Sequence, residues 1–116
     1  MKLELFYVPT SDLPASLALY RDAFGGTELW REGDTTVALT FPGTETYVML
    51  DSSNATRAAG PTFAVDKVAD FHASLPAGLT VVKEPTEIPG GNWAIYTDAG
   101  GTNIYVVDQA TDSAVS

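Results

Sequence analysis

Residues 98–107 read DAGGTNIYVV, a tight turn that runs directly into a β-strand. The two glycines can adopt the positive φ that a tight reversal requires, and the carboxylate of Asp98 can cap the turn. Beyond the turn the side chains alternate between two faces, so that Asn103 and Tyr105 share one face and Ile104 lies on the other. The pattern predicts a hairpin near the end of the chain.

The first half of the chain has the pattern of a strand, a helix and three short strands. Asp12 is a favourable N-cap, and Leu13, Leu17, Tyr20 and Phe24 recur at helical spacing on one expected buried face. A glycine pair then ends the helix. The expected elements are a strand at 3–8, a helix at 12–24, and strands at 27–31, 36–41 and 46–51.

The second half repeats this order after the small, polar segment 52–59. Asp66 is the expected N-cap of a shorter helix, and residues 84–92 are expected to form a loop because they hold two prolines and two glycines. The expected strands are 61–65, 79–83, 93–97 and 103–108. The chain is therefore expected to be one domain over 1–116, with module one at 2–51, a linker at 52–59, module two at 60–108 and a frayed tail at 109–116.

Short sequence matches support an internal duplication. Phe6-Tyr7-Val8 corresponds to Phe63-Ala64-Val65, and the Gly-Thr pairs at 43–44 and 101–102 are each followed two residues later by Tyr-Val. These matches agree in order with the elements, which indicates a repeat of about half the chain. One such half cannot bury its sheet alone, so two must pair. The expected fold class is α+β, built from two βαβββ modules.

Composition limits the classes of function. Hydrophobic residues make up 45% of the chain and charged residues 18%, which is typical of a folded domain. The absence of cysteine excludes disulfides, thiolate catalysis and a cysteine-based zinc site. The net charge of −9 disfavours binding to nucleic acid or anionic lipid. No apolar run suggests a signal peptide or a membrane span, so we expect a cytoplasmic protein.

Three segments, taken in order, resemble one known superfamily. Residues 8–22, marked by Val8, Asp12 and Leu17, resemble its opening "V-x-D-L-x-x-S-L-x-F-Y", with two extra residues in the turn. Residues 63–66, FAVD, resemble the "F-x-V-D-D" start of its second module, and residues 98–105 resemble its final hairpin. The superfamily is the vicinal oxygen chelate group of glyoxalases, bleomycin-resistance proteins and extradiol dioxygenases. The resemblance implies two βαβββ modules whose curved sheets form a cup, usually in a homodimer.

The resemblance also implies where metal ligands would lie. Catalytic members place them at four inward strand positions, which correspond here to Leu3, to Tyr47 or Met49, to Gly60 and to Tyr105. None of these is His, Glu or Asp, whereas divalent-metal sites need several such donors. A phenol is a poor donor at neutral pH because its pKa is about 10. We therefore expect no metal, no cofactor and no catalytic residue, and a metal-dependent lyase, isomerase or dioxygenase is the alternative.

Other reactive groups are few. His72 is the only histidine and is expected on the surface or half-buried edge of the second helix. Asp51 shares the face of Tyr47 by alternation and is expected to be a solvated acid at a strand end. Tyr7, Tyr47 and Tyr105 could act as proton donors only with a lowered pKa, and no cation lies near them in the sequence.

Without metal ligands, the implied cup would be lined by apolar and aromatic side chains, as small-molecule sites usually are. The same residues could instead fill the core, and the tryptophans could pack or form a dimer contact. We predict that the cup sequesters a small aromatic or cationic compound, such as an antibiotic, with the acidic segment 84–92 as a lid. The expected ligand-binding residues are Leu5, Tyr7, Trp30, Tyr47, Met49, Trp93, Asn103 and Tyr105.

Overall fold

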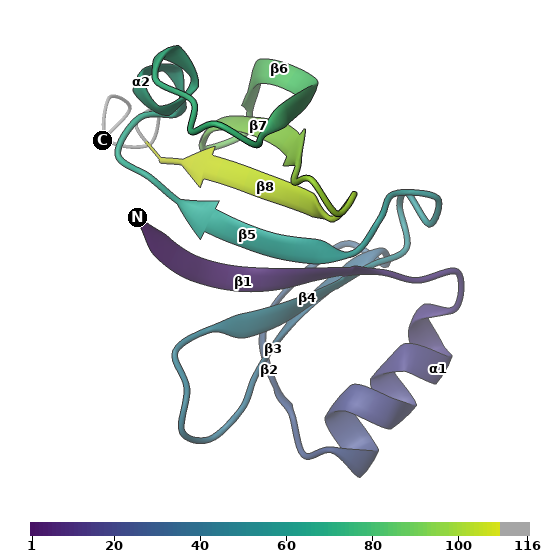
Figure 1. Cartoon of the computed structure of the whole chain (residues 1–116). Coiled ribbons are helices and arrows are strands. Elements are labelled where there is room, and N and C mark those ends of the chain that lie inside the picture. Colours follow the sequence, from purple (N-terminus) through teal and green to yellow (C-terminus); the bar gives the residue numbers. More distant parts are fainter. Residues whose placement is uncertain (110–116) are drawn as a thin grey trace. The chain divides into compact units, whose positions relative to one another are not determined.

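The computed structural model describes residues 1–109, which form two compact units. One unit is Glu4–Ala59, and the other joins Met1–Leu3 to the chain from Gly60 onward. Each unit contains a strand, a helix and three further strands in that order (Figure 1). The tail expected to fray lies, apart from Gln109, outside the described residues.

Module one forms a mixed sheet in the order β2-β3-β4-β1. The strands β1 and β4 are parallel, and β3 is antiparallel to both β2 and β4. The expected strands are confirmed to within one or two residues at their ends. The elements are β1 (Lys2–Pro9), α1 (Leu13–Leu17), a π-helical turn η1 (Ala18–Ala23), β2 (Thr27–Glu32), β3 (Thr36–Thr40) and β4 (Tyr47–Asp51).

The helix of module one begins and ends where the sequence predicts, but its last turn is wider. The Asp12 carboxylate accepts the N–H of Ala15 at 3.0 Å, which confirms the N-cap. At the other end the N–H of Phe24 bonds to the carbonyl of Leu19 at 2.9 Å, five residues back. This π-type spacing rotates the last residues relative to a regular helix. Phe24 is therefore 61% exposed, and the prediction that it shares the buried face was wrong.

The core of module one lies between this helix and one face of the sheet. Leu13 and Leu17 pack with a cluster of buried strand residues, Val37, Leu39 and Leu50, and half-buried Val8 and Val48 extend it. The opposite side of the sheet, which we call the helix-free face of module one, carries Leu5, Tyr7, Tyr47 and Met49, because side chains alternate along each strand.

The strands of module two follow the order β5-β8-β7-β6, with β5 and β8 parallel and β7 antiparallel to both β6 and β8. The elements are β5 (Gly60–Ala64), α2 (Val68–Ala73), β6 (Thr80–Ile88), β7 (Gly91–Thr97) and β8 (Asn103–Asp108). The prediction of a loop at 84–92 was wrong, because β6 continues to Ile88 and the chain turns at Gly90 into β7. Pro85 is tolerated because the pairing register with β7 shifts between Lys83 and Thr86.

The helix of module two is anchored from outside its own sequence. Its N-cap is Lys67, which supplies no side-chain hydrogen bond, so the prediction of Asp66 as the cap was wrong. Instead the carboxylate of Asp108, at the end of β8, accepts the N–H of Val68 at 2.7 Å. Buried Val68, Ala94, Tyr96 and Val106 form the core beneath α2.

The two modules share the same strand register. In module one Phe6 pairs with Val48 across the parallel strands β1 and β4, and in module two Phe63 pairs with Val106 across β5 and β8. This equivalence places Tyr47 and Tyr105 at matching positions, as the Gly-Thr repeat predicts. The chain is an α+β protein made of two βαβββ modules with mixed sheets.

Candidate functional site

An aromatic pair stands on the helix-free face of module one. The rings of Trp30 on β2 and Tyr47 on β4 meet edge to face, with 6.3 Å between centroids and 78° between planes. Ala38 on the intervening strand β3 pairs with Trp30, and its small side chain leaves room for this contact. Trp30 is 37% exposed. Burial and the charge of Glu4 raise the pKa of Tyr47, so its phenol is neutral at pH 7.

The far end of the same face is closed by Asp51, which is only 6% exposed. Its Oδ2 accepts the hydroxyl of Tyr7 at 2.5 Å. Its Oδ1 accepts the hydroxyl of Thr36 at 3.1 Å, and the N–H and hydroxyl of Ser53 at 2.9 and 2.6 Å. The prediction of a solvated acid was wrong, although alternation gave the correct face. A carboxylate with this many donors has little capacity left for a ligand or a metal.

These bonds fix the protonation states of the pair. Burial and the hydrogen bond to Asp51 raise the pKa of Tyr7 well above its usual range, against a smaller opposing effect of Arg57. Burial alone would raise the pKa of Asp51, but the bonds from Ser53 and Tyr7 outweigh it and lower the pKa. Arg57 is thus a cation near Tyr7 that the sequence analysis missed. It does not make Tyr7 an acid, because the Asp51 bond holds the phenolic proton.

Module two carries its own aromatic group. Trp93 on β7 stacks on Tyr105 of β8, with 6.1 Å between centroids and 15° between planes. The amide nitrogen of Asn103 donates to the Tyr105 hydroxyl at 3.2 Å. Tyr105 is 2% exposed, whereas Trp93 and Asn103 are half-buried. The three residues expected here do lie together.

The superfamily's metal-ligand positions do not suit a divalent metal in this chain. Leu3 is apolar and 42% exposed, and Tyr47, Met49 and Tyr105 offer no carboxylate or imidazole. Gly60 could carry no side chain at all, because a Cβ there would lie 2.1 Å from the carbonyl oxygen of Asn103. Within residues 1–109 no group of three His, Cys, Asp or Glu could hold a metal ion.

His72 is half-buried, as expected, and takes part in a structural link. Its Nδ1 lies 2.8 Å from the Tyr96 hydroxyl, and its Nε2 lies 2.8 Å from a carboxylate oxygen of Glu84. A neutral imidazole satisfies both contacts by accepting at Nδ1 and donating at Nε2. Burial and the charge of Glu84 raise the pKa of Tyr96, so this phenol also stays protonated. The link ties α2 to β6 and β7.

The partners of Asp51 were not apparent in the sequence, although one signal existed. Residues 51–53 read Asp-Ser-Ser, and an aspartate commonly accepts the N–H two residues later. This local motif predicts the contact with Ser53. The contacts with Tyr7 and Thr36 depend on strand pairing and have no local signature.

Solved structures of other proteins share this fold. The structure of an NAD-dependent benzaldehyde dehydrogenase from Legionella pneumophila matches with a TM-score of 0.75 at 12% identity, covering 90% of this chain and 97% of that one. A methylmalonyl-CoA epimerase from Mycobacterium tuberculosis matches with a TM-score of 0.65 at 19% identity, covering 99% and 92%. A glyoxalase/bleomycin resistance protein/dioxygenase superfamily member from Vibrio splendidus 12B01 matches with a TM-score of 0.64 at 14% identity, covering 90% and 96%.

At these identities the structural matches establish the fold alone. No curated protein matches the sequence. Among the described residues, no helix has the length and apolar character needed to cross a membrane. The sequence model of one family, however, matches residues 2–106, nearly the whole chain. The protein belongs to the Glyoxalase/Bleomycin resistance protein/Dioxygenase superfamily.

Proposed function

We propose that the protein is a metal-free, small-molecule-binding member of its superfamily that sequesters a planar aromatic or cationic compound, such as an antibiotic. One observation carries this proposal. The helix-free face of module one presents the aromatic pair Trp30 and Tyr47 where catalytic relatives are expected to present metal donors.

Recognition on this face would rely on ring contacts. Stacking against Trp30 contributes about 0.5–1.5 kcal/mol beyond area burial, and a cation over the indole contributes about 0.5–2 kcal/mol. Met49 lies in the same row of strand pairs as Trp30 and Ala38, and its flexible thioether can adapt to a flat ligand. Leu5 and Tyr7 lie on the same face, beside Tyr47 and Met49, and are buried.

Charge would favour cations without a direct ion pair. The net charge of −9 attracts cations over a distance, whereas Asp51 is already engaged by four hydrogen-bond donors. A bound cation would therefore be held by the aromatic faces rather than by a carboxylate. This preference should weaken with added salt, because screening reduces long-range attraction.

A binding experiment with matched tryptophan variants tests the proposal. Isothermal titration against a panel of cationic and aromatic antibiotics should identify at least one ligand below the millimolar range. Trp30→Ala should weaken that ligand about tenfold, while Trp93→Phe, a change in the other aromatic group, should leave its affinity nearly unchanged. A panel with no binder, or equal losses in both variants, would count against the proposal.

The alternative is a metal-dependent lyase, isomerase or dioxygenase of the same superfamily. Metal analysis of the purified protein after dialysis distinguishes this alternative from the metal-free binding protein. A stoichiometric Zn, Ni, Mn or Fe signal would overturn the metal-free proposal. A homodimer, which the superfamily resemblance implies, belongs to the same proposal, and sedimentation equilibrium tests it directly.

A further inference from the structure

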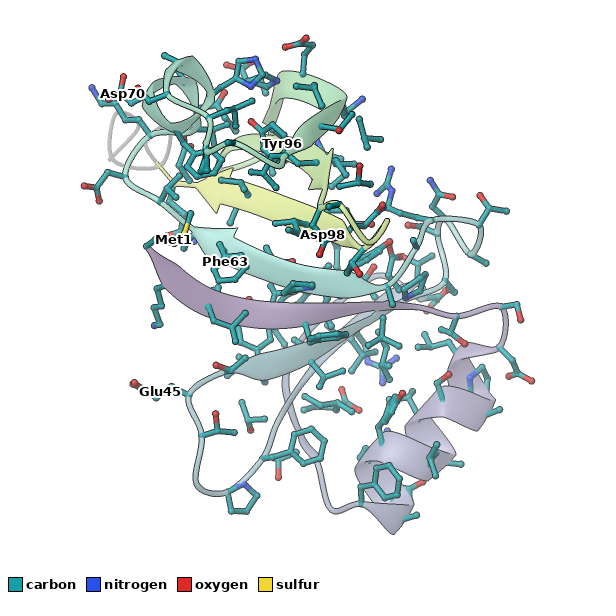
Figure 2. The ribbon with its side chains drawn as sticks, in the orientation of Figure 1. Met1, Glu45, Phe63, Asp70, Tyr96 and Asp98 are labelled. Carbon is teal, nitrogen blue, oxygen red and sulfur yellow. The ribbon has the colours of Figure 1, made fainter. Side chains whose placement is uncertain are left out.

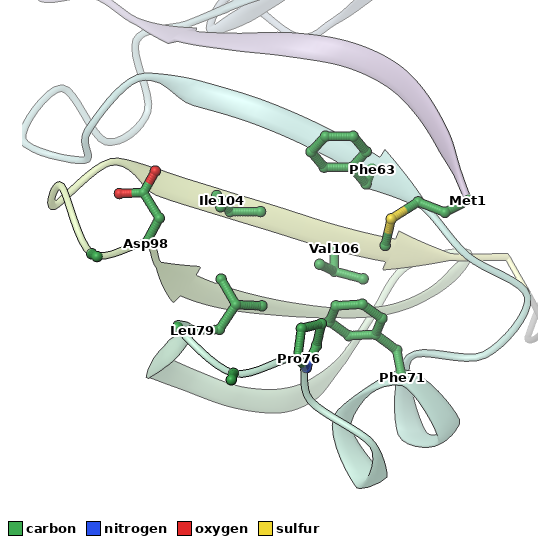
Figure 3. A pocket seen from close by; sticks show the side chains of 11 residues that line it. Met1, Phe63, Phe71, Pro76, Leu79, Asp98, Ile104 and Val106 are labelled. Carbon is green, nitrogen blue, oxygen red and sulfur yellow. The ribbon is translucent and has the colours of Figure 1, made fainter.

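A groove lies on the side of module two where α2 packs, opposite the face that carries Tyr105. Its floor is formed by Phe63 on β5 with Ile104 and Val106 on β8, and one wall is formed by Phe71 of α2 and residues 76–79 (Figure 3). The cavity volume is about 420 Å³. That volume lies within the usual range of sites for small ligands.

The groove exists because the helix of module two is short. In module one the helical segment runs on to Ala23, and Tyr20 packs onto the sheet together with Val48. In module two α2 ends at Ala73 and is followed by Pro-Ala-Gly at 76–78, whose small side chains line the groove together with Ile104. Phe63 and Asp98, which both line the groove, are labelled in Figure 2.

The lining is apolar except for one carboxylate at one end, that of Asp98. Its Oδ1 accepts the N–H groups of Gly100 and Thr102, both at 2.9 Å. These bonds hold the carboxylate in a fixed position within its turn. No described residue within 1–109 bonds to the second oxygen, Oδ2, which can accept from a ligand.

We propose that this groove is a second binding site, which takes an amphiphilic amine. The apolar body would lie on Phe63, Phe71 and Ile104, which line the groove and are half-buried, and the ammonium group would lie beside Asp98. Anionic amphiphiles are disfavoured by the same carboxylate and by the net charge of −9. The site is independent of the proposed function, because its residues and those of the Trp30–Tyr47 face belong to different modules.

Three probes that differ only in their polar end test the site: 4-phenylbutylamine, 4-phenylbutanol and 4-phenylbutanoate. Binding is followed at neutral pH through the backbone amide NMR signals of the full chain. The amine should cause saturable shifts around Ile104 and Val106, the alcohol should bind more weakly, and the carboxylate weakest. Asp98→Asn keeps the turn-capping oxygen and removes the charge, so it should weaken the amine about two- to fivefold and leave the alcohol unchanged.

Two further variants locate the site. Ala77→Trp places a large ring into the groove from an exposed position and should weaken all three probes at least tenfold. Trp30→Ala should change none of the affinities measured from the signals of Ile104 and Val106, whatever its effect on the antibiotic panel. The proposal is overturned if the amine causes no saturable shift at Ile104 and Val106, if all three probes bind equally, or if Ala77→Trp has no effect.

Discussion

Both modules pack their helices onto an apolar core, but they differ at one matched position between helix and sheet. In module one, the position that pairs with Val8 of β1 is Leu50, a fully buried residue that packs with Leu13 and Leu17 of α1. By the shared register, the equivalent position in module two is Asp108. It faces the helix too, but it accepts the N–H of Val68 at the start of α2 instead of packing against it.

This difference follows from how each helix begins. The first helix has its own cap in Asp12, so its sheet can offer an apolar surface. The second has no side-chain cap, so its first N–H needs an acceptor from elsewhere. The two modules therefore share a fold but fix the start of the helix differently. In module two a buried carboxylate from the sheet accepts the first helical N–H.

The largest expected effect comes from removing that carboxylate. Asp108→Ala would leave the buried N–H of Val68 and the N–H of Asn92, which also bonds to Asp108, without acceptors. At about 1–3 kcal/mol for each unsatisfied group, we expect a loss of about 4 kcal/mol in the free energy of unfolding. Urea denaturation measures it. Asp108→Asn, which keeps one acceptor, should lose about half as much, and equal losses would contradict this explanation.

A glycine gives the next largest effect. By register Gly60 of module two corresponds to Leu3 of module one, yet only Gly60 is pressed against a backbone carbonyl, that of Asn103. Gly60→Ala should therefore destabilise the protein by about 3 kcal/mol, because strand β5 must move away from β8. Leu3→Ala is the matched control and should cost about 1 kcal/mol, since Leu3 is 42% exposed and its substitution creates no steric conflict. Similar losses in both variants would remove the steric argument.

The strands could be predicted from sequence because their side chains alternate between the face that packs against the helix and the opposite face. Alternation then fixes both the strand and its face, as for Val48, Val106 and the matched tyrosines Tyr47 and Tyr105. Prediction failed at β6, where Pro85 suggested a loop, because the register shift that accommodates it depends on pairing with β7. It also failed for Phe24, because the π-type turn that exposes it has no simple sequence signal.

The candidate site was less predictable than the fold. The aromatic residues were found because large rings at alternating positions are visible in the sequence. The sequence does not show that Trp30 stays 37% exposed whereas Tyr105, stacked on Trp93, is buried. These exposures depend on neighbouring residues from other strands. The bond between Tyr7 and Asp51 joins residues 44 positions apart, so no local pattern could reveal it.

A smaller loss of stability is expected from a substitution on the helix-free face of module one, where β4 ends at Asp51. Tyr7→Phe removes one hydroxyl and keeps the ring, so it tests the bond to Asp51 without opening a cavity. A hydrogen bond to a charged group contributes about 1.5–3 kcal/mol, and we expect a loss near the lower value because Asp51 keeps its bonds from Ser53 and Thr36. Tyr20→Phe, on a half-buried tyrosine without such a bond to a carboxylate, should cost less, as measured by thermal or urea unfolding.

The smallest effect is the acid dependence that Asp51 contributes. Its hydrogen bonds lower its pKa in the folded state below the ordinary value of 3.8, so the unfolded chain takes up the proton first as the pH falls. The stability contributed by Asp51 is therefore complete above about pH 5 and is lost as the pH falls through the folded-state pKa. Asp51→Asn lacks this titration. The difference in unfolding free energy between the natural protein and Asp51→Asn should shrink as the pH is lowered from about 5 towards 2, because the other acidic groups are common to both proteins. A difference that stays constant over this range would show that the Asp51 carboxylate is not preferentially stabilised in its ionised form by Tyr7, Thr36 and Ser53.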